Sequence, residues 1–397
     1  MSSVDFLNKL LDGVEVEWKA LGTLVKTVTA PSKLKTQAYC TSGKLPIIDQ
    51  GIGFIAGYTD EDISPVRAGK YVIFGDHSEH IKYVDFSFVQ GADGIKILSP
   101  ISSNAKYIFY AFENFYKKEL SYKRHWSNAQ ETLIPIPCPD NPKKSLEIQA
   151  EIVRILDGLT ELTTELTTEL ITRKKQYKHY LDQLLSFEDG EVEWKALGGI
   201  GDFTYGYVAK AQDSGDTRFV RITDINADGK LIVADSKYVD LSEENEKFLL
   251  KKNDLLMART GATYGKTMIF EEDYLAIYAG FLIKLSLDER LVNPKFYWHF
   301  AQSDFFWNQA NKLVSGGGQP QFNANVLKEV KMPVPYPSDP VRSLTEQARI
   351  VAILDKFDAL TNSLTEGLPR EIELRQKQYE HYRDLLLSFP KPQEVVA

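Results

Sequence analysis

The sequence predicts an α+β protein in which two globular modules are separated by two long helices, with an internal pseudo-twofold repeat. Four segments each occur twice in the chain: residues 149–157 and 347–355, 173–180 and 375–382, 15–22 and 191–198, and 134–139 and 332–337. Repetition of this kind indicates internal duplication. The order of the copies gives a plan of module, helix, module, helix.

The first module is expected to cover residues 1–143. Near its end, residues 134–139 alternate proline with other residues. Proline cannot continue a helix or a central strand, so this segment predicts an extended edge strand that closes the module. Short β-rich runs separated by glycine turns, and then an aromatic-rich helix, are expected between the repeated ends, at 71–74, 83–89, 94–98 and 107–116.

The first long helix is expected at residues 144–188. Ile152, Leu159 and Leu166 are seven residues apart, and neither glycine nor proline occurs between Leu159 and Phe187. A seven-residue apolar repeat forms one apolar seam that requires a partner helix, and the other copy is the simplest partner. Two ordinary core helices are a weaker alternative, because about 40 residues far exceeds the usual helix length.

The second module is expected at residues 189–341, with a strand at 255–258 and a helix at 294–310. Its ends match those of the first module, but its interior does not, which suggests one kind of task on two different targets. The second long helix is expected at residues 342–389, followed by a tail at 390–397. Proline disfavours helix in the residue before it, so Pro369 predicts a kink or break near Leu368.

Composition is that of a multi-part protein without a membrane segment. A chain of 397 residues is long enough for two cores of ordinary size. No apolar run reaches the length of a membrane helix, and the first six residues lack the pattern of a signal peptide. Cys40 and Cys138 have no metal-ligand spacing, so free thiols and a cytoplasmic location are expected.

The charge of the chain is unevenly distributed. A net charge of −8 argues mildly against nucleic acid. Basic residues nevertheless gather at 19–48, 101–127 and 247–270, and the middle cluster is interleaved with aromatic residues. Such clusters are typical of phosphate contacts combined with base reading. The alternative is a solvated basic face over an aromatic core, which charge alone slightly favours.

Apparent catalytic motifs are incomplete. Residues 261–267 resemble a phosphate-binding loop but have three residues between the glycines instead of four. The Glu-x-Lys at the start of each module lacks the upstream Pro-Asp of some nucleases and is better explained as a structural brace. His77 and His80 have no nearby third ligand for zinc. We therefore predict no catalytic residue and no metal site.

The repeated helix motifs resemble those of the specificity subunits of type I restriction–modification systems. The resemblance covers nearly the whole chain. It rests on Gln-x-x-Ile-Val-x-Ile-Leu-Asp at the start of each helix, and on Gln-Tyr-x-x-Tyr at 176–180 and 378–382. Segments inside the modules also look like target-recognition domains of two types: 73–77, 89–94 and 124–126 in the first, and 256–261, 265–266 and 316–321 in the second.

The resemblance implies a subunit that does no chemistry and reads a bipartite DNA target, with one recognition domain for each half-site. The helices would pair as an antiparallel coiled coil and dock two methyltransferase subunits, to which restriction subunits are added. S-adenosylmethionine, ATP and magnesium are expected in these partners, with no cofactor in this subunit and adenine as the methylated base. A helix of about 40 residues is about 60 Å long, enough to separate two half-sites across an unread gap.

The predicted site residues fall into two groups. Polar and basic residues, mostly at turns, are expected to contact DNA because arginine and lysine pair with guanine and glutamine with adenine: Lys33, Lys35, Lys44, Asp76, His77, Lys123, Arg124, His125, Arg259, Thr260, Thr263, Tyr264, Lys266, Gln319 and Gln321. Helix residues are expected to dock partner subunits: Gln149, Tyr177, Tyr180, Gln347, Tyr379 and Tyr382. Two other functions stay open, a stand-alone DNA-modifying enzyme (nuclease or methyltransferase) and a coiled-coil scaffold without a DNA role.

Overall fold

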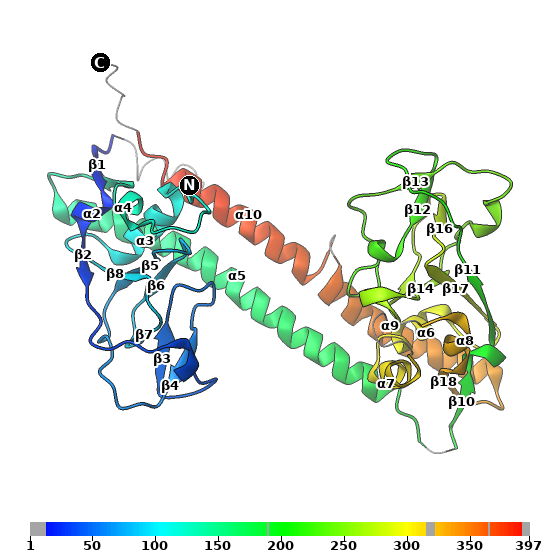
Figure 1. Cartoon of the computed structure of the whole chain (residues 1–397). Helices are drawn as coiled ribbons and strands as arrows, with labels where there is room; N and C mark the ends of the chain where they lie inside the picture. Colours follow the sequence, from blue (N-terminus) through cyan, green and yellow to red (C-terminus); the bar gives the residue numbers. More distant parts are fainter. Residues whose placement is uncertain (1–12, 189, 315–321, 364–365, 391–397) are drawn as a thin grey trace. The chain divides into compact units, whose positions relative to one another are not determined.

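The chain forms two compact units, each built from a globular module and parts of the long helices. The computed structural model describes residues 13–188, 190–314, 322–363 and 366–390. One unit combines residues 1–165 with 373–397, and the other comprises residues 166–372 (Figure 1). Mixed helix and sheet make up both units, as the sequence predicts.

The described residues of the first unit form nine strands and several short helices, followed by the first long helix. Its elements are β1 (Val16–Ala20), α2 (Leu21–Leu24), β2 (Val25–Val28), η1 (Thr36–Ala38), β3 (Leu45–Ile48), β4 (Gly57–Thr59), β5 (Tyr71–Gly75), β6 (Ile81–Val84), β7 (Val89–Gln90), β8 (Ile95–Pro100), α3 (Ala105–Phe115), α4 (Trp126–Ala129), β9 (Leu133–Pro137) and the start of α5 (Pro142–Leu184).

The second unit begins within α5 and has the same order of strands, with more short helices between them. Its elements are β10 (Val192–Ala196), η2 (Leu197–Gly199), β11 (Gly201–Tyr205), β12 (Thr217–Val220), η3 (Ile222–Asp224), β13 (Tyr238–Val239), η4 (Glu246–Phe248), β14 (Leu255–Ala258), η5 (Gly261–Thr263), β15 (Thr267–Ile269), β16 (Ala276–Tyr278), β17 (Leu282–Leu287), α6 (Pro294–Phe300), α7 (Asp304–Leu313), α8 (Ala324–Glu329), β18 (Lys331–Pro335), α9 (Pro340–Asn362) and the start of α10 (Leu368–Leu386).

The two modules have the same sheet topology. A four-stranded antiparallel sheet has the order β2-β8-β5-β6 in the first module and β11-β17-β14-β15 in the second. A three-stranded sheet has the order β4-β3-β7 in the first and β13-β12-β16 in the second, each with one antiparallel and one parallel pairing. The unlike interior sequences therefore specify one architecture.

A two-stranded sheet closes each module. β1 pairs with β9, where Trp18 lies opposite Pro135, and β10 pairs with β18, where Trp194 lies opposite Pro333. Proline donates no ladder hydrogen bond, so it is accommodated where a strand has only one neighbour. This confirms the predicted extended edge segments and shows that the repeated Glu-Val-Glu-Trp-Lys-Ala sequence forms the strand paired with each of them.

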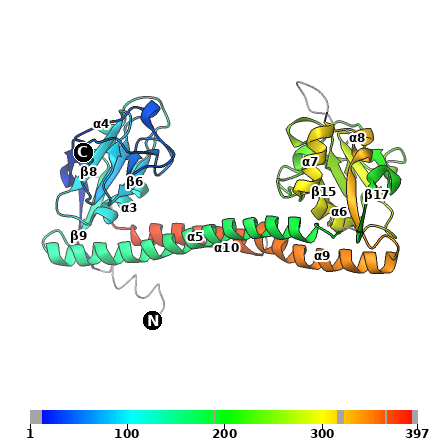
Figure 2. The same cartoon turned by 90° about the horizontal axis from the view of Figure 1, so that it is seen from below.

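Each module packs its apolar core against the start of one long helix and the end of another. In the first unit, Ile152 and Leu156 of α5 share a core with Leu386 of α10 and with α3. In the second, Leu354 of α9 shares a core with Leu181, from the last turns of α5, and with α6. Figures 1 and 2 show the first module beside the N-terminal part of α5. An amphipathic helix gains most of its stability from such packing.

Some element boundaries differ from the sequence prediction. The second long helix is two helices, α9 and α10, as the proline at position 369 predicts. Gly367 has φ +87°, and a Cβ there would lie 2.4 Å from the Ala359 carbonyl oxygen, so this glycine is required at the break. The helix expected at 294–310 is also divided, because Ser303 caps α7 by accepting a hydrogen bond from the Phe306 N–H. The strand expected at 83–89 is two short strands, β6 and β7.

Candidate nucleic-acid interface

Matching hydrogen bonds attach each module to the helix that follows it. The Gln149 side-chain oxygen accepts a hydrogen bond from the Asn104 N–H at 2.8 Å, directly before α3. In the second unit, the Gln347 side-chain oxygen accepts from the Asn293 N–H at 2.9 Å, directly before α6. The repeated glutamine therefore satisfies a free N–H at the start of a helix in both modules.

A second matching contact lies two turns further along each long helix. In the first unit, Asp157 accepts hydrogen bonds from Lys106 Nζ and from the Tyr110 hydroxyl, both at 2.7 Å. In the second unit, Asp355 accepts from Lys295 Nζ at 3.2 Å and from His299 Nε2 at 2.8 Å. The repeated aspartate thus accepts hydrogen bonds from one lysine and from one tyrosine or histidine side chain in each module.

His299 is fully buried between the second module and the helices. Its Nδ1 lies 3.0 Å from the Tyr177 hydroxyl of α5, and its Nε2 contacts Asp355 of α9. Burial lowers the pKa of His299, so the imidazole is neutral at pH 7. Burial opposes ionisation of Asp355, but the hydrogen bond from His299 and the charge of Lys295 lower its pKa overall.

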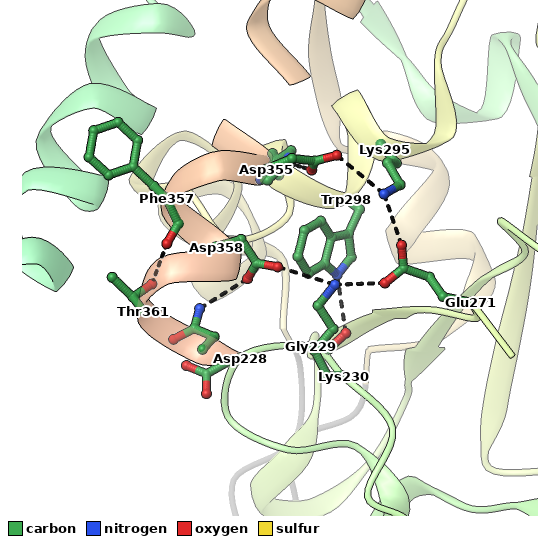
Figure 3. Close-up of polar contacts among 12 residues, drawn as sticks. Asp228, Gly229, Lys230, Glu271, Lys295, Trp298, Asp355, Phe357, Asp358 and Thr361 are labelled. Carbon is green, nitrogen blue, oxygen red and sulfur yellow. Dashed lines mark hydrogen bonds and ion pairs between the residues drawn. The ribbon is translucent and has the colours of Figure 1, made fainter. Parts of the chain in front are cut away.

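In the second unit, an ion-pair network lies beside the contact between His299 and Asp355 (Figure 3). Lys230 Nζ lies 4.2 Å from the centre of the Trp298 ring, 2.8 Å from Glu271 and 3.2 Å from Asp358. Lys295 Nζ lies 2.8 Å from Glu271 and 3.2 Å from Asp355 of α9, so it links the two carboxylates. These charges line a cleft of about 530 Å³. Because its carboxylates are paired with lysines of the same unit, the network is suited to fixing α9 on the module.

Three residues of the predicted docking surface are buried. Gln149 and Gln347 are 1% and 0% exposed, and Tyr177 is 9% exposed. All three side chains are hydrogen-bonded within their own unit. Tyr180 is 41% exposed and stacks on Phe357 with ring centres 5.3 Å apart.

The two remaining tyrosines of the predicted docking surface, Tyr379 and Tyr382, are half-buried against the core of the first unit. Burial, with the nearby Glu113 carboxylate, raises the pKa of Tyr379 to about 12. Their hydroxyl-bearing rings therefore contribute to packing within the unit as well as to its surface.

The candidate DNA-reading residues of the first module meet at the end of β5. The N–H of Asp76 donates to the Gly94 carbonyl at 2.6 Å, and the Asp76 carbonyl accepts from the His125 N–H at 2.8 Å. The Asp76 carboxylate also accepts from the N–H groups of His125 and Trp126 at 3.0 and 2.8 Å. Asp76 is 6% exposed and His125 is fully buried, so in this structure neither side chain is presented on the surface where the sequence analysis expects it. They hold the loop at residues 116–125.

Glu79 is a residue of this site that the sequence did not reveal. It has φ +58° and is 2% exposed. Its carboxylate accepts hydrogen bonds from the Tyr116 hydroxyl at 2.7 Å and from the N–H groups of Glu119 and Leu120 at 2.8 Å. Burial alone would raise the pKa of Glu79, but these hydrogen bonds lower it. A charged group buried in this way fixes the loop backbone.

The outer face of the same loop carries the exposed candidates. Lys123 and Arg124 are exposed, and the Lys123 carbonyl lies 3.0 Å from His77 Nδ1. The His77 ring stacks on Tyr122, which is 94% exposed, with ring centres 5.4 Å apart. An exposed aromatic ring beside two cations is a surface on which a nucleic acid can be bound.

Three further lysines of the first module lie on its surface. Lys33 pairs with Asp93 at 2.8 Å, and Arg124 is close enough to that carboxylate to help lower its pKa, after the larger effect of Lys33. Lys35 and Lys44 are exposed, before η1 and before β3 respectively. Lys33 bridges Gln90 of the three-stranded sheet, and its ion pair with Asp93 brings it near Arg124 of the loop. Lys35 and Lys44 lie near the same sheet.

The second module has its candidate residues at the corresponding strand end. Arg259 directly follows β14, its N–H donates to the Phe281 carbonyl at 3.1 Å, and its carbonyl accepts from the Phe322 N–H at 2.8 Å. These are the same backbone contacts that Asp76 makes with Gly94 and His125. His125 in the first module thus corresponds to Phe322 in the second. Gln319 and Gln321 lie outside the described residues.

The other predicted residues of the second module surround the turn after Arg259. Thr260 and Thr263 are half-buried, and the Thr263 hydroxyl donates to the Thr260 carbonyl at 3.3 Å. The Tyr264 hydroxyl donates to Asn311 at 2.9 Å, and Lys266 lines a small cavity of about 140 Å³. Within the second module, the structure gathers all the described candidates at one end of the four-stranded sheet.

Over residues 13–188, 190–314, 322–363 and 366–390, no group of three His, Cys, Asp or Glu side chains has an arrangement that could bind a metal ion. In the same part of the chain, no helix combines the length and apolarity needed to cross a bilayer. Cys40 and Cys138 form no disulfide.

Comparison with known proteins identifies the family. A sequence profile described as the type I restriction modification DNA specificity domain matches residues 190–374. The chain is 41% identical to the type I restriction enzyme EcoR124I/EcoR124II specificity subunit of Escherichia coli, over the full length of both. It is 32% identical to the putative specificity subunit S.HindORF215P of Haemophilus influenzae, over 97% of this chain and 98% of that protein.

A solved structure has the same fold. The type I restriction–modification S subunit from M. genitalium superposes with a TM-score of 0.61 at 14% identity, covering 96% of this chain and 98% of that one. The fold and the relatives together define a DNA-recognition protein of a restriction–modification system. The chain belongs to the specificity subunits of type I restriction enzymes, which are non-catalytic and recognise DNA.

Proposed function

We propose that this subunit reads a bipartite DNA target, with one module for each half-site. The observation that carries the proposal is the shared topology of the two modules with unlike residues at the same strand end. Asp76, with the loop of Lys123 and Arg124, occupies this end in the first module, and Arg259 occupies it in the second. Two modules that share a topology but carry different residues at this strand end are suited to reading two different short sequences.

The helices are proposed to hold the half-sites apart and to carry the catalytic partners. They pair as an antiparallel coiled coil and bind two methyltransferase subunits, one at each pseudo-symmetric copy of the helix surface, and restriction subunits complete the complex. S-adenosylmethionine, ATP and magnesium belong to those partners, adenine is the methylated base, and the complex acts in the cytoplasm. The matching attachments of Gln149 and Gln347 support this proposal, because they give both halves of the chain the same frame.

A binding selection tests the proposal directly. The full chain is reconstituted with a methyltransferase subunit from its own source and is used to select from randomised duplex DNA. Two short fixed motifs at a constant separation are expected. A single contiguous motif would contradict the assignment of one half-site to each module, and no enrichment even at low salt would favour a scaffold without a DNA role.

A further inference from the structure

Arg259 is held at a defined place in the second module by its backbone and by its neighbours in the sheet. Its N–H and carbonyl are both bonded, to Phe281 and Phe322 respectively. Tyr205 ends β11, Phe281 precedes β17 and Arg259 follows β14, and these strands are neighbours in the order β11-β17-β14 (Figure 1). Three residues that are distant in the sequence therefore meet at one end of one sheet.

The Arg259 guanidinium lies against two aromatic rings. Its central carbon is 5.0 Å from the centre of the Tyr205 ring and 5.3 Å from that of Phe281. The Tyr205 ring is itself fixed, because its hydroxyl accepts a hydrogen bond from the Ala324 N–H at 3.2 Å. Guanidinium–ring contacts favour a defined orientation of the planar fork.

The donors of this arginine are not used within the described part of the chain. Arg259 Nε is buried without a hydrogen-bond partner there, and no described carboxylate forms an ion pair with the guanidinium. In contrast, Arg221 of the same module is paired with Asp224 at 2.8 Å. No described side chain holds the terminal nitrogens of Arg259 by hydrogen bonding, so these donors of the oriented guanidinium are left for an acceptor supplied by a ligand.

The rings beside Arg259 remain open to solvent. Tyr205 is 43% exposed and Phe281 is 55% exposed. A ligand can therefore approach the guanidinium along these rings. For a DNA-reading module the acceptor is a base edge or a phosphate, and the fixed planar fork matches the paired O6 and N7 acceptors of guanine.

We propose that Arg259, oriented by Tyr205 and Phe281, reads a guanine in the half-site of the second module. The assignment rests on the proposed function and adds the base and the residues that position the reader. Arg259 contacts the base through its terminal nitrogens, whereas Tyr205 and Phe281 are positioning residues that restrict the guanidinium.

Base substitution in the reconstituted complex tests this assignment. Binding is measured on the selected target, on targets with each base pair of the second half-site changed, and on a target with 7-deazaguanine, which lacks the N7 acceptor. Arg259→Ala is expected to lose about 5- to 150-fold of discrimination at one guanine and none in the first half-site. The 7-deazaguanine target should weaken binding of the unmodified protein several-fold and have no further effect on Arg259→Ala.

Matched variants separate reading from charge and from folding. Arg259→Lys keeps the charge but loses the fork, so it should lose discrimination at the same guanine, and Phe281→Ala should do so more weakly. Arg290→Ala removes an exposed arginine paired with Asp288 and should leave discrimination unchanged. Retained selectivity in the first half-site shows that each variant complex is assembled.

Three outcomes would overturn the assignment. An equal loss on every sequence, with a salt slope reduced by about one, would make Arg259 a phosphate contact. A bipartite target that is insensitive to all Arg259 variants would refute the reading role while leaving the proposed function intact. A selection without two motifs would instead refute the proposed function.

Discussion

Replacement of Gln347 by leucine tests whether the repeated glutamine holds its own module or docks a partner. The Gln347 side chain is 0% exposed and has three partners. Its oxygen accepts from the Asn293 N–H at 2.9 Å, and its nitrogen donates to the Leu291 carbonyl at 2.9 Å and to the Ser343 hydroxyl at 3.1 Å. Leucine fills a similar volume but can replace none of these hydrogen bonds.

The structure gives the size of the expected effect. Gln347→Leu leaves one backbone N–H and one backbone carbonyl without their partners, and each such group costs about 1–3 kcal/mol. Since both groups are only partly buried, we expect a loss of about 3 kcal/mol in the free energy of opening the contact between α6 and α9. Such a loss speeds amide exchange of α6 by about 100-fold.

Two matched variants provide the comparison. Gln149→Leu removes only the bond from the Asn104 N–H among backbone partners, so the exchange of α3 should rise less, by about tenfold. Gln183→Leu changes an exposed glutamine of α5 and should alter neither helix. Hydrogen exchange followed by mass spectrometry on the full chain resolves peptides from α3 and α6 separately.

The reasoning would be refuted by unchanged exchange at α6. If Gln347→Leu left that exchange unaltered and abolished binding of the methyltransferase subunit, the glutamine would be a docking residue and the observed hydrogen bonds would contribute little.

Three other perturbations have expected outcomes. His299→Tyr should remove a pH dependence of the melting temperature. Burial lowers the pKa of His299 in the folded protein. The neutral imidazole therefore contributes fully to stability above the unfolded pKa of about 6.5, and this contribution is lost as the pH falls from there towards the folded pKa. Melting temperatures at pH 7.5 and 5.5 should therefore differ less in the variant, which copies Tyr110 of the first module, and an equal difference would contradict this reading. Gly367→Ala should lower the melting temperature by several degrees, because φ is +87° and the added Cβ meets the Ala359 carbonyl; an unchanged value would show that the break relaxes freely. Deleting four residues within 160–168 of α5 shortens the helix by about 6 Å, so the methylated sequence should show a shorter gap between half-sites, and an unchanged gap would refute the spacer hypothesis.

The frame of each module could be predicted from the sequence because it is repeated there. The Trp-containing strand, the proline-rich strand and the start of each long helix recur nearly residue for residue. The break between α9 and α10 could also be predicted, since Gly367 and Pro369 limit the backbone locally.

The interiors of the modules could not be predicted in the same way. Their strands are as short as two residues, such as β7 and β13, and a run of that length has no periodicity. The orientation of the Arg259 guanidinium depends on the rings of Tyr205 and Phe281. These residues are distant in the sequence, and only the order of the strands in the sheet brings them together. Glu79 has a left-handed backbone conformation for which its sequence contains no signal.

The common topology explains how one scaffold can accept two unlike recognition surfaces. Pairing of β5 with β8, and of β14 with β17, places the residue after the strand at the same point in both modules. Backbone hydrogen bonds alone fix that point, since the N–H and carbonyl of Asp76 and Arg259 make matching contacts. The side chain there is therefore free to differ: Asp76 turns inward to hold a basic loop, whereas Arg259 remains between two open rings. Specificity can change at this position without disturbing the helix attachments. Those attachments use other residues, since Gln149 accepts from the Asn104 N–H and Gln347 accepts from the Asn293 N–H.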